Sequence, residues 1–168
     1  MMKLKFFFVI LFLVPNFIFS QEATEFTKVK TSTGVVKIPG TWTQLNTADE
    51  SDQTYLKNND GVVIAIAQNP KKAYPFFKPN KSAFENVKEF YKWDSDYRKQ
   101  NKFKTEKLKE SLKREYIIWK YNDGKMDNIF LFGSTGSDFS NLLIYTNIWT
   151  QEKQIEFLEN VYQLNNTY

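Results

Sequence analysis

The stretch that decides the fold runs from Tyr116 to Trp149 and reads YIIWKYNDGKMDNIFLFGSTGSDFSNLLIYTNIW. Two turn sequences, Asn122–Gly124 and Gly133–Asp138, divide it into three apolar segments. An Asp-Gly pair supplies the positive φ that tight hairpin turns require. The stretch therefore predicts three consecutive antiparallel strands, the last of which runs from Leu142 to Trp149.

These three strands are apolar at consecutive positions, as in Ile117-Ile118-Trp119, Ile129-Phe130-Leu131-Phe132 and Leu142-Leu143-Ile144-Tyr145. A sheet with one face in water alternates apolar and polar residues instead. We therefore expect both faces of this sheet to be covered.

Two segments with helical spacing flank the strands and are the natural covers. Ser82 and Glu85 form a capping box, in which each side chain satisfies a free backbone amide of the other residue. The helix that follows is expected to end near Gln100, and its apolar residues are Phe84, Val87, Phe90, Tyr91 and Tyr97. A second helix is expected after Thr150, with Ile155, Leu158, Val161 and Tyr162 on one face.

Two further hairpins are expected upstream, around the turn sequences Thr31–Gly34 and Asn58–Gly61. No linker or repeat interrupts the chain after its first twenty residues. The fold class predicted from these elements is α+β, with an antiparallel β-sheet covered by helices on both faces. This α/β/α sandwich is expected to form a single domain over residues 21–168.

The order of these elements, together with the segment Ile38-Pro39-Gly40-Thr41-Trp42, resembles the PsbP-like superfamily over roughly residues 26–164. That superfamily is an α/β/α sandwich shared by a photosystem extrinsic subunit, a Ran-release factor and many small exported bacterial proteins. The resemblance implies a PsbP-like domain with a binding or accessory role. It implies no functional residues, because the photosystem subunits are linked to metal ions partly through histidine, which this chain lacks.

Residues 1–20 have the features of a secretory signal peptide. Lys3 and Lys5 precede an apolar run from Phe6 to Val14, and Ser20 precedes the expected cleavage point. The run is much shorter than the roughly twenty residues that span a bilayer, so an uncleaved membrane anchor is the weaker alternative. The ending Phe-Ser-Gln is similar to those of Bacteroidota. We expect an exported protein, periplasmic or extracellular, that is not a lipoprotein and has no membrane span after cleavage.

The chain of 168 residues contains no histidine and no cysteine. Their absence excludes His/Cys zinc sites, thiol nucleophiles, disulfides and the Ser-His-Asp triad. No arrangement of carboxylates, serines or glycines has the spacing of a known catalytic or phosphate-binding motif. We therefore predict that the protein is not an enzyme, and we predict no cofactor or metal site.

The segment from Asn69 to Lys81 combines prolines, lysines and aromatic residues and contains no acidic residue. Exposed aromatic rings on a basic loop are typical of a recognition surface. The residues predicted to bind a partner are Lys71, Lys72, Tyr74, Phe76, Phe77 and Lys78. The alternative is that the aromatic residues fold back as a structural lid over the edge of the sheet.

The run from Arg98 to Arg114 carries eight basic and two acidic residues, but an exported protein rarely meets nucleic acid. We expect most of these lysines to point outward along a strand, and we predict no nucleic-acid partner. Two functions remain. The first is an exported non-enzymatic binding or accessory protein that acts on another envelope or secreted protein. The second is a small-ligand or glycan binder that uses a cleft between helix and sheet.

Overall fold

The computed structural model describes residues 25–48 and 51–166, which form nine strands, two α-helices and one 3-10 helix. The strands are β1 (Phe26–Lys30), β2 (Val35–Pro39), β3 (Thr43–Ala48), β4 (Gln53–Lys57), β5 (Val63–Pro70), β6 (Lys104–Ser111), β7 (Tyr116–Asn122), β8 (Asp127–Thr135) and β9 (Asp138–Tyr145). The helices are η1 (Lys71–Ala73), α1 (Ala83–Gln100) and α2 (Gln151–Asn165).

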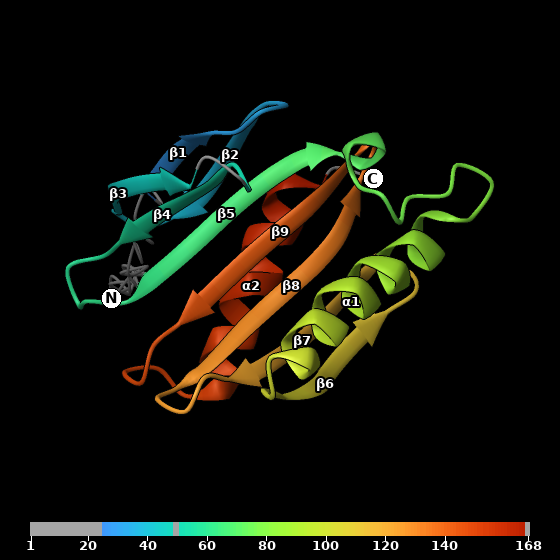
Figure 1. Cartoon of the computed structure of the whole chain (residues 1–168). Helices are drawn as coiled ribbons and strands as arrows, with labels where there is room; N and C mark the ends of the chain where they lie inside the picture. The colour runs from blue at the N-terminus through green and yellow to red at the C-terminus, as the bar shows by residue number, and fades with distance from the viewer. Residues whose placement is uncertain (1–24, 49–50, 167–168) are drawn as a thin grey trace, which may run out of the picture.

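Seven strands form one antiparallel sheet in the order β3-β4-β5-β9-β8-β7-β6. Most neighbours in this sheet are joined by short turns. The exception is the pair β5–β9, in which Ala65 lies opposite Leu143. This long-range pairing joins the β3–β5 strands to the C-terminal strands and places β9 at the centre of the sheet (Figure 1).

The first hairpin, β1–β2, forms a separate two-stranded sheet. Its turn is closed by a hydrogen bond from the Thr31 amide to the Gly34 carbonyl at 2.8 Å. The side chain of Asn165 in α2 accepts from the Lys37 amide at 2.7 Å and donates to the Lys37 carbonyl at 2.8 Å. The hairpin is therefore fixed to the helix that shares its side of the large sheet.

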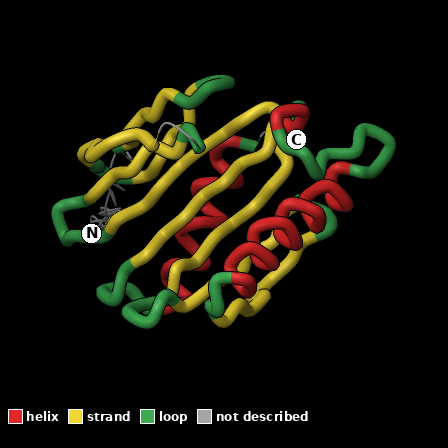
Figure 2. The backbone as a smooth tube through the Cα atoms, viewed as in Figure 1, coloured by secondary structure: helices red, strands yellow, loops and turns green. Residues whose placement is uncertain are grey.

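Both helices begin at the residues that the sequence predicts. The Glu85 amide donates to the Ser82 hydroxyl, and the Ser82 amide donates to the Glu85 carboxylate, which completes the capping box. Thr150 caps α2 by accepting from the amide of Lys153. Figures 1 and 2 show α1 in front of the large sheet and α2 behind it.

The expected α/β/α sandwich, a sheet covered by helices on both faces, is wrong. The described residues are 44% strand and 26% helix, and only two α-helices accompany the seven-stranded sheet and the separate two-stranded sheet. The physical reason is width. A helix is about 10 Å across and strands lie about 4.8 Å apart, so one helix covers only two or three strands. Helix α1 lies mainly against β6, β7 and β8, and on the other face α2 shares the covering with the β1–β2 hairpin.

Two apolar clusters lie on opposite faces of the sheet. The face toward α2 and the hairpin, called here the closed face, is mostly aliphatic and includes Ile64, Ile66, Ile118, Ile129, Leu131, Leu142 and Ile144. The face toward α1, called here the open face, is largely aromatic and includes Trp119, Phe130, Phe132 and Phe139. Alternate residues of each strand point to opposite faces, so the same strands contribute to both clusters.

The hairpin turns expected from the sequence are confirmed, but the last turn is shorter than expected, because β8 runs to Thr135 and β9 begins at Asp138 rather than Leu142. Strand β9 ends at Tyr145 rather than Trp149. The polar edge strand β3 is not predicted from the sequence, because nearly all of its residues are exposed and show no alternation. In the lysine-rich run, β6 forms the opposite edge, where lysines discourage pairing with other chains.

The expected signal peptide, residues 1–20, lies outside the described residues. None of the helices in the described ranges is long and apolar enough to cross a membrane.

Candidate functional site

The loop between β5 and α1, residues 71–81, carries all six residues predicted to bind a partner. Its aromatic rings are half-buried and face inward. The ring centroids of Tyr74 and Phe76 lie 5.0 and 5.3 Å from that of Phe90 in α1, and Phe77 lies 6.4 Å from Phe139 in β9. This is the packing that the lid interpretation expects.

The three lysines of the predicted surface differ in exposure. The Nζ of Lys71 donates to the Gly136 carbonyl at 2.6 Å and the residue is 9% exposed, whereas Lys72 and Lys78 are exposed. The buried amide of Asn86 bonds both the N–H and the carbonyl of Lys78, which holds the loop in shape. A partner-binding role for this loop stays a prediction.

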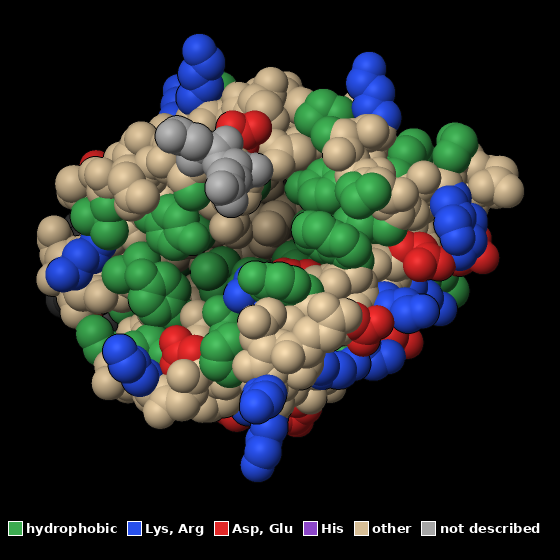
Figure 3. Space-filling model, viewed as in Figure 1, with side chains coloured by type: hydrophobic (Ala, Val, Ile, Leu, Met, Phe, Trp, Pro, Cys, Tyr) green, Lys and Arg blue, Asp and Glu red, His purple; other side chains and the backbone are tan. Residues whose placement is uncertain are grey.

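A second feature lies beside α1, where the open face of the sheet is hollowed. Two hollows of about 650 and 420 Å³ adjoin one another and share Gln53, Arg98 and Phe130. Together we call them the open-face groove, whose residues include Tyr55, Tyr74, Trp93, Arg98, Asn141 and Tyr145. Figure 3 shows the hollow in this face, with hydrophobic side chains on both sides of it.

Some of the aromatic side chains that line the groove remain partly in water. Trp93 and Tyr97, one turn apart on α1, are 50% and 56% exposed. Half-buried Tyr55 and Tyr145 come from the sheet. Large apolar groups left in water are costly, and where several gather in a concave site they commonly mark a binding surface.

A charged pair lies where the two hollows meet. The Nε of Arg98 donates to Oδ1 of Asp94 at 3.1 Å, and its guanidinium stands 4.5 Å from the centroid of the Tyr121 ring. Burial raises the pKa of the Asp94 carboxyl, and the charge of Arg98 opposes that effect. Because Arg98 is anchored through Nε alone among the described residues, its other N–H groups stay available to a ligand.

The floor of the groove contains an unpartnered amide on the central strand. The Oδ1 of Asn141 is buried and has no hydrogen-bond partner among the described residues. A buried polar atom without a partner costs about 1–3 kcal/mol. Such an atom needs an explanation, and its position in the lining of a groove suggests that a bound group supplies the missing hydrogen bond.

Tyrosine hydroxyls add further hydrogen-bonding groups. Burial raises the pKa values of Tyr74, Tyr121 and Tyr145 above the ordinary value for tyrosine. All three hydroxyls therefore stay protonated at neutral pH and can both donate and accept.

Strand β5 presents small residues to the open face and larger ones to the closed face. Ala65 and Ala67 point to the open face, whereas Ile64 and Ile66 point to the closed face. Of the groove residues, only Tyr74 is among those that the sequence predicts to bind a partner. A signal was present, since aliphatic and aromatic residues alternate in Ile129-Phe130-Leu131-Phe132 even though hydrophobicity does not.

Within the part of the chain that the structure describes, no group of three or more acidic side chains is placed to hold a metal ion. Comparison with protein-family models finds no match, and no curated protein matches the sequence. The resemblance to the PsbP-like superfamily is untouched by these comparisons and stays a prediction.

Proposed function

We propose that the chain is a binding protein that holds a small hydroxylated ligand in the open-face groove, with an oligosaccharide as the best chemical match. The observation that carries this proposal is the combination of residues that line the groove. Exposed Trp93 and Tyr97 line the same hollow as the unpartnered amide of Asn141. Ligand sites combine such apolar walls with a few convergent polar groups.

A sugar ring fits these groups because it has two kinds of surface. Its C–H faces are apolar and pack against flat aromatic rings such as Trp93 and Tyr97. Its rim of hydroxyls can donate to the Asn141 carbonyl oxygen and accept from the free N–H groups of Arg98. The combined hollows, about 650 and 420 Å³, have room for more than one ring.

The exposed aromatic residues are not explained by folding alone. Tyr74 and Phe76 lie within 6.5 Å of Trp93, but half of the Trp93 surface remains in water. A residue with this exposure contributes little to stability, so its presence in a groove is better explained by binding.

The test is titration of the chain from residue 21 with soluble cello-, chito-, malto- and xylo-oligosaccharides, followed by tryptophan fluorescence and calorimetry. We expect at least one series to bind, and Trp93→Ala to weaken binding by about tenfold or more, which corresponds to about 1.4 kcal/mol. The free energy of unfolding of this variant should change by less than about 1 kcal/mol.

Phe26→Ala is the matched control, because Phe26 is a 40% exposed aromatic residue on the β1–β2 hairpin, away from the groove. Its affinity should equal that of the wild type. Binding that persists unchanged in Trp93→Ala, or that no series shows, would contradict the proposal.

The expected leader supports a role outside the cytoplasm, where polymeric sugars are abundant. A protein partner that binds the exposed part of the 71–81 loop is compatible with this function. The double variant Lys72→Glu, Lys78→Glu separates partner binding from sugar binding. It reverses the charge of the loop surface and leaves the groove lining intact, so only binding of a protein partner should be lost.

A further inference from the structure

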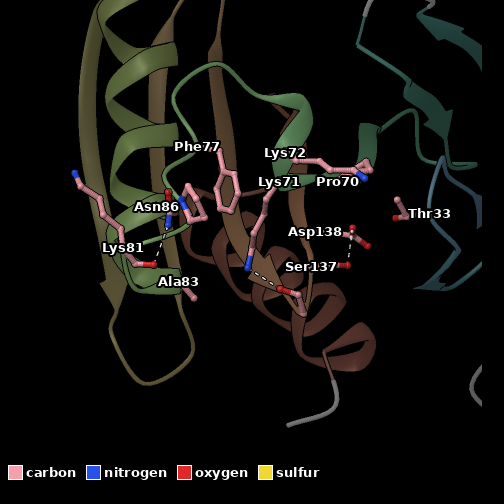
Figure 4. Close-up of a pocket in the computed structure, with 12 residues that line it drawn as sticks. Thr33, Pro70, Lys71, Lys72, Phe77, Lys81, Ala83, Asn86, Ser137 and Asp138 are labelled. Carbon is pink, nitrogen blue, oxygen red and sulfur yellow. Dashed lines mark hydrogen bonds between the residues drawn. The ribbon is translucent and has the colours of Figure 1, made fainter.

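A third hollow, of about 730 Å³, lies between the 71–81 loop, the start of α1 and the β8–β9 turn (Figure 4). We call it the loop pocket, and its residues include Pro70, Lys71, Phe77, Pro79, Ala83 and Gly136. It shares only Pro70 with the lining of the open-face groove. Its volume is within the range of small-molecule sites, about 300–1,000 Å³.

The loop pocket is lined by both apolar and polar residues. Pro70, Phe77, Pro79 and Ala83 supply hydrocarbon surface from three different segments. The Asn86 amide also lines the pocket, but the loop backbone and Ser82 already use its donors and acceptor. The pocket therefore offers a ligand hydrocarbon surface beside charged groups, which are Lys71, Lys72, Lys81 and Asp138.

One of the three lysines that line the pocket is buried. Figure 4 shows the Lys71 side chain extending into the pocket beside Phe77, with Nζ bonded to the Gly136 carbonyl. An ammonium group has three N–H donors, so two remain after this bond. Among the described residues no carboxylate forms an ion pair with Lys71, and burial lowers its pKa, while Glu115 and Asp138 oppose the shift.

The other charged residues around the pocket do not supply a counter-ion for Lys71. Lys81 is already paired with Glu89, and Lys72 is exposed. Asp138 lines the pocket but accepts from Gln68 at 3.3 Å and from its neighbour Ser137 at 3.2 Å. Of the three lysines that line the pocket, Lys71 is thus the one that is both buried and without an ion pair among the described residues.

We propose that the loop pocket binds an organic monocarboxylate with an apolar body, such as a medium-chain fatty acid, whose carboxylate pairs with Lys71. The carboxylate accepts the two unused N–H donors and neutralises the buried charge, which is the arrangement that makes a buried ion favourable. The hydrocarbon body covers Phe77 and the prolines. This site is independent of the open-face groove.

The test is calorimetric titration of the chain from residue 21 with octanoate, 1-octanol and octylammonium. We expect octanoate to bind, with affinity about tenfold or more above that of 1-octanol, and octylammonium not to bind. Lys71→Met should reduce octanoate affinity to that of the alcohol. Lys78→Met, which removes an exposed lysine of the same loop that does not line the pocket, should leave it unchanged.

Because Lys71 also holds the β8–β9 turn, the Lys71→Met variant can lose its fold, and a second measurement uses the wild type. In protein with ¹³C-labelled lysine, octanoate should raise the pKa of Lys71 and 1-octanol should not. Absence of octanoate binding, equal affinity for octanoate and 1-octanol, undiminished binding by folded Lys71→Met, or an unmoved Lys71 pKa would each overturn the proposal.

Discussion

The two faces of the seven-stranded sheet are built from different residues and are covered to different extents. On the closed face, aliphatic side chains of the central strands are sealed by α2 and the β1–β2 hairpin. On the open face, α1 reaches mainly the β6–β8 side, and aromatic side chains line a groove over the rest. Apolar composition alone therefore does not distinguish a face that stabilises the fold from one that is left open.

The comparison indicates that the two faces of the sheet have different roles, one in stability and the other in binding. Aliphatic residues interdigitate at high density, so the closed face should respond strongly to any change of volume. The open face also has a packed core, in which Trp119, Phe132 and Phe139 are buried, but other rings on this face line the groove and remain partly in water. Substitutions on the closed face should thus affect stability, whereas those in the groove should affect binding.

The largest loss of stability is expected for Gly133→Ala on the closed face. A Cβ at this position would stand 2.3 Å from a ring atom of Tyr162, which is 2% exposed and donates to the Ser134 carbonyl at 2.7 Å. The ring has to move and lose that bond, at a cost of about 4 kcal/mol in the free energy of unfolding. Urea denaturation measures it.

Gly34→Ala is the control, since no atom lies within 4 Å of a Cβ there. Its stability should stay within about 0.5 kcal/mol of the wild type. If Gly133→Ala proves equally harmless, the closed face is less tightly packed than the structure indicates.

A smaller loss of stability is expected for Phe76→Ala in the 71–81 loop. The Phe76 ring is half-buried and lies 5.3 Å from Phe90 and 5.4 Å from Trp93, measured between centroids. Its removal should cost about 2 kcal/mol, less than for a fully buried ring. Lys78→Ala, in the exposed part of the loop, should cost less than about 0.5 kcal/mol. Equal effects in the two variants would argue against the lid interpretation.

Asn141→Leu should change stability and binding in opposite directions. The substitution removes a buried oxygen that has no partner, so the free energy of unfolding should rise by about 1 kcal/mol. Sugar binding in the groove should be lost with the amide. Asn141→Ala, which also leaves a cavity, should lose binding without the gain in stability. A stabilised Asn141→Leu that still binds sugar at wild-type affinity would mean that this amide serves no ligand.

The smallest effect concerns pH and Asp94. Because burial raises the pKa of this carboxyl, the folded state binds its proton more tightly than the unfolded state does. The contribution of Asp94 to stability therefore declines as pH rises from its ordinary pKa of about 3.9 through the raised one. The free energy of unfolding of the wild type, minus that of Asp94→Asn, should increase as the pH falls through this window. A difference that is constant with pH would show that Arg98 fully offsets the burial.

The sequence predicts the local elements well because their signals are local. The capping box at Ser82 and the Asp-Gly turn at Gly124 depend on neighbouring residues, and the structure places both where the sequence does. The pairing of β5 with β9 has no such signal, since it joins strands far apart in the chain. How much of each face a helix covers depends on that pairing, which is why the sandwich prediction failed.

The candidate site was anticipated only as a cleft between helix and sheet, without its residues. Trp93 and Tyr97 follow the same helical spacing as core residues, and only the tertiary structure shows that α1 leaves them at the rim. The loop residues Tyr74 and Phe76 stand out in the sequence because they are aromatic residues in a basic, proline-rich loop, but in the structure both rings pack against Phe90 of α1.

The most direct test of the claim that binding occurs on the open face is a map of ligand contacts by nuclear magnetic resonance. ¹⁵N-labelled chain from residue 21 would be titrated with the oligosaccharide series that binds best, and backbone amide shifts would be followed. We predict changes centred on the groove lining, in β4, the 71–81 loop near Tyr74, the open-face residues of β8 and β9 and the Trp93–Arg98 side of α1, with β2 and α2 unaffected. Changes centred on β2 and α2, or none with any oligosaccharide, would contradict the assignment of binding to the open face.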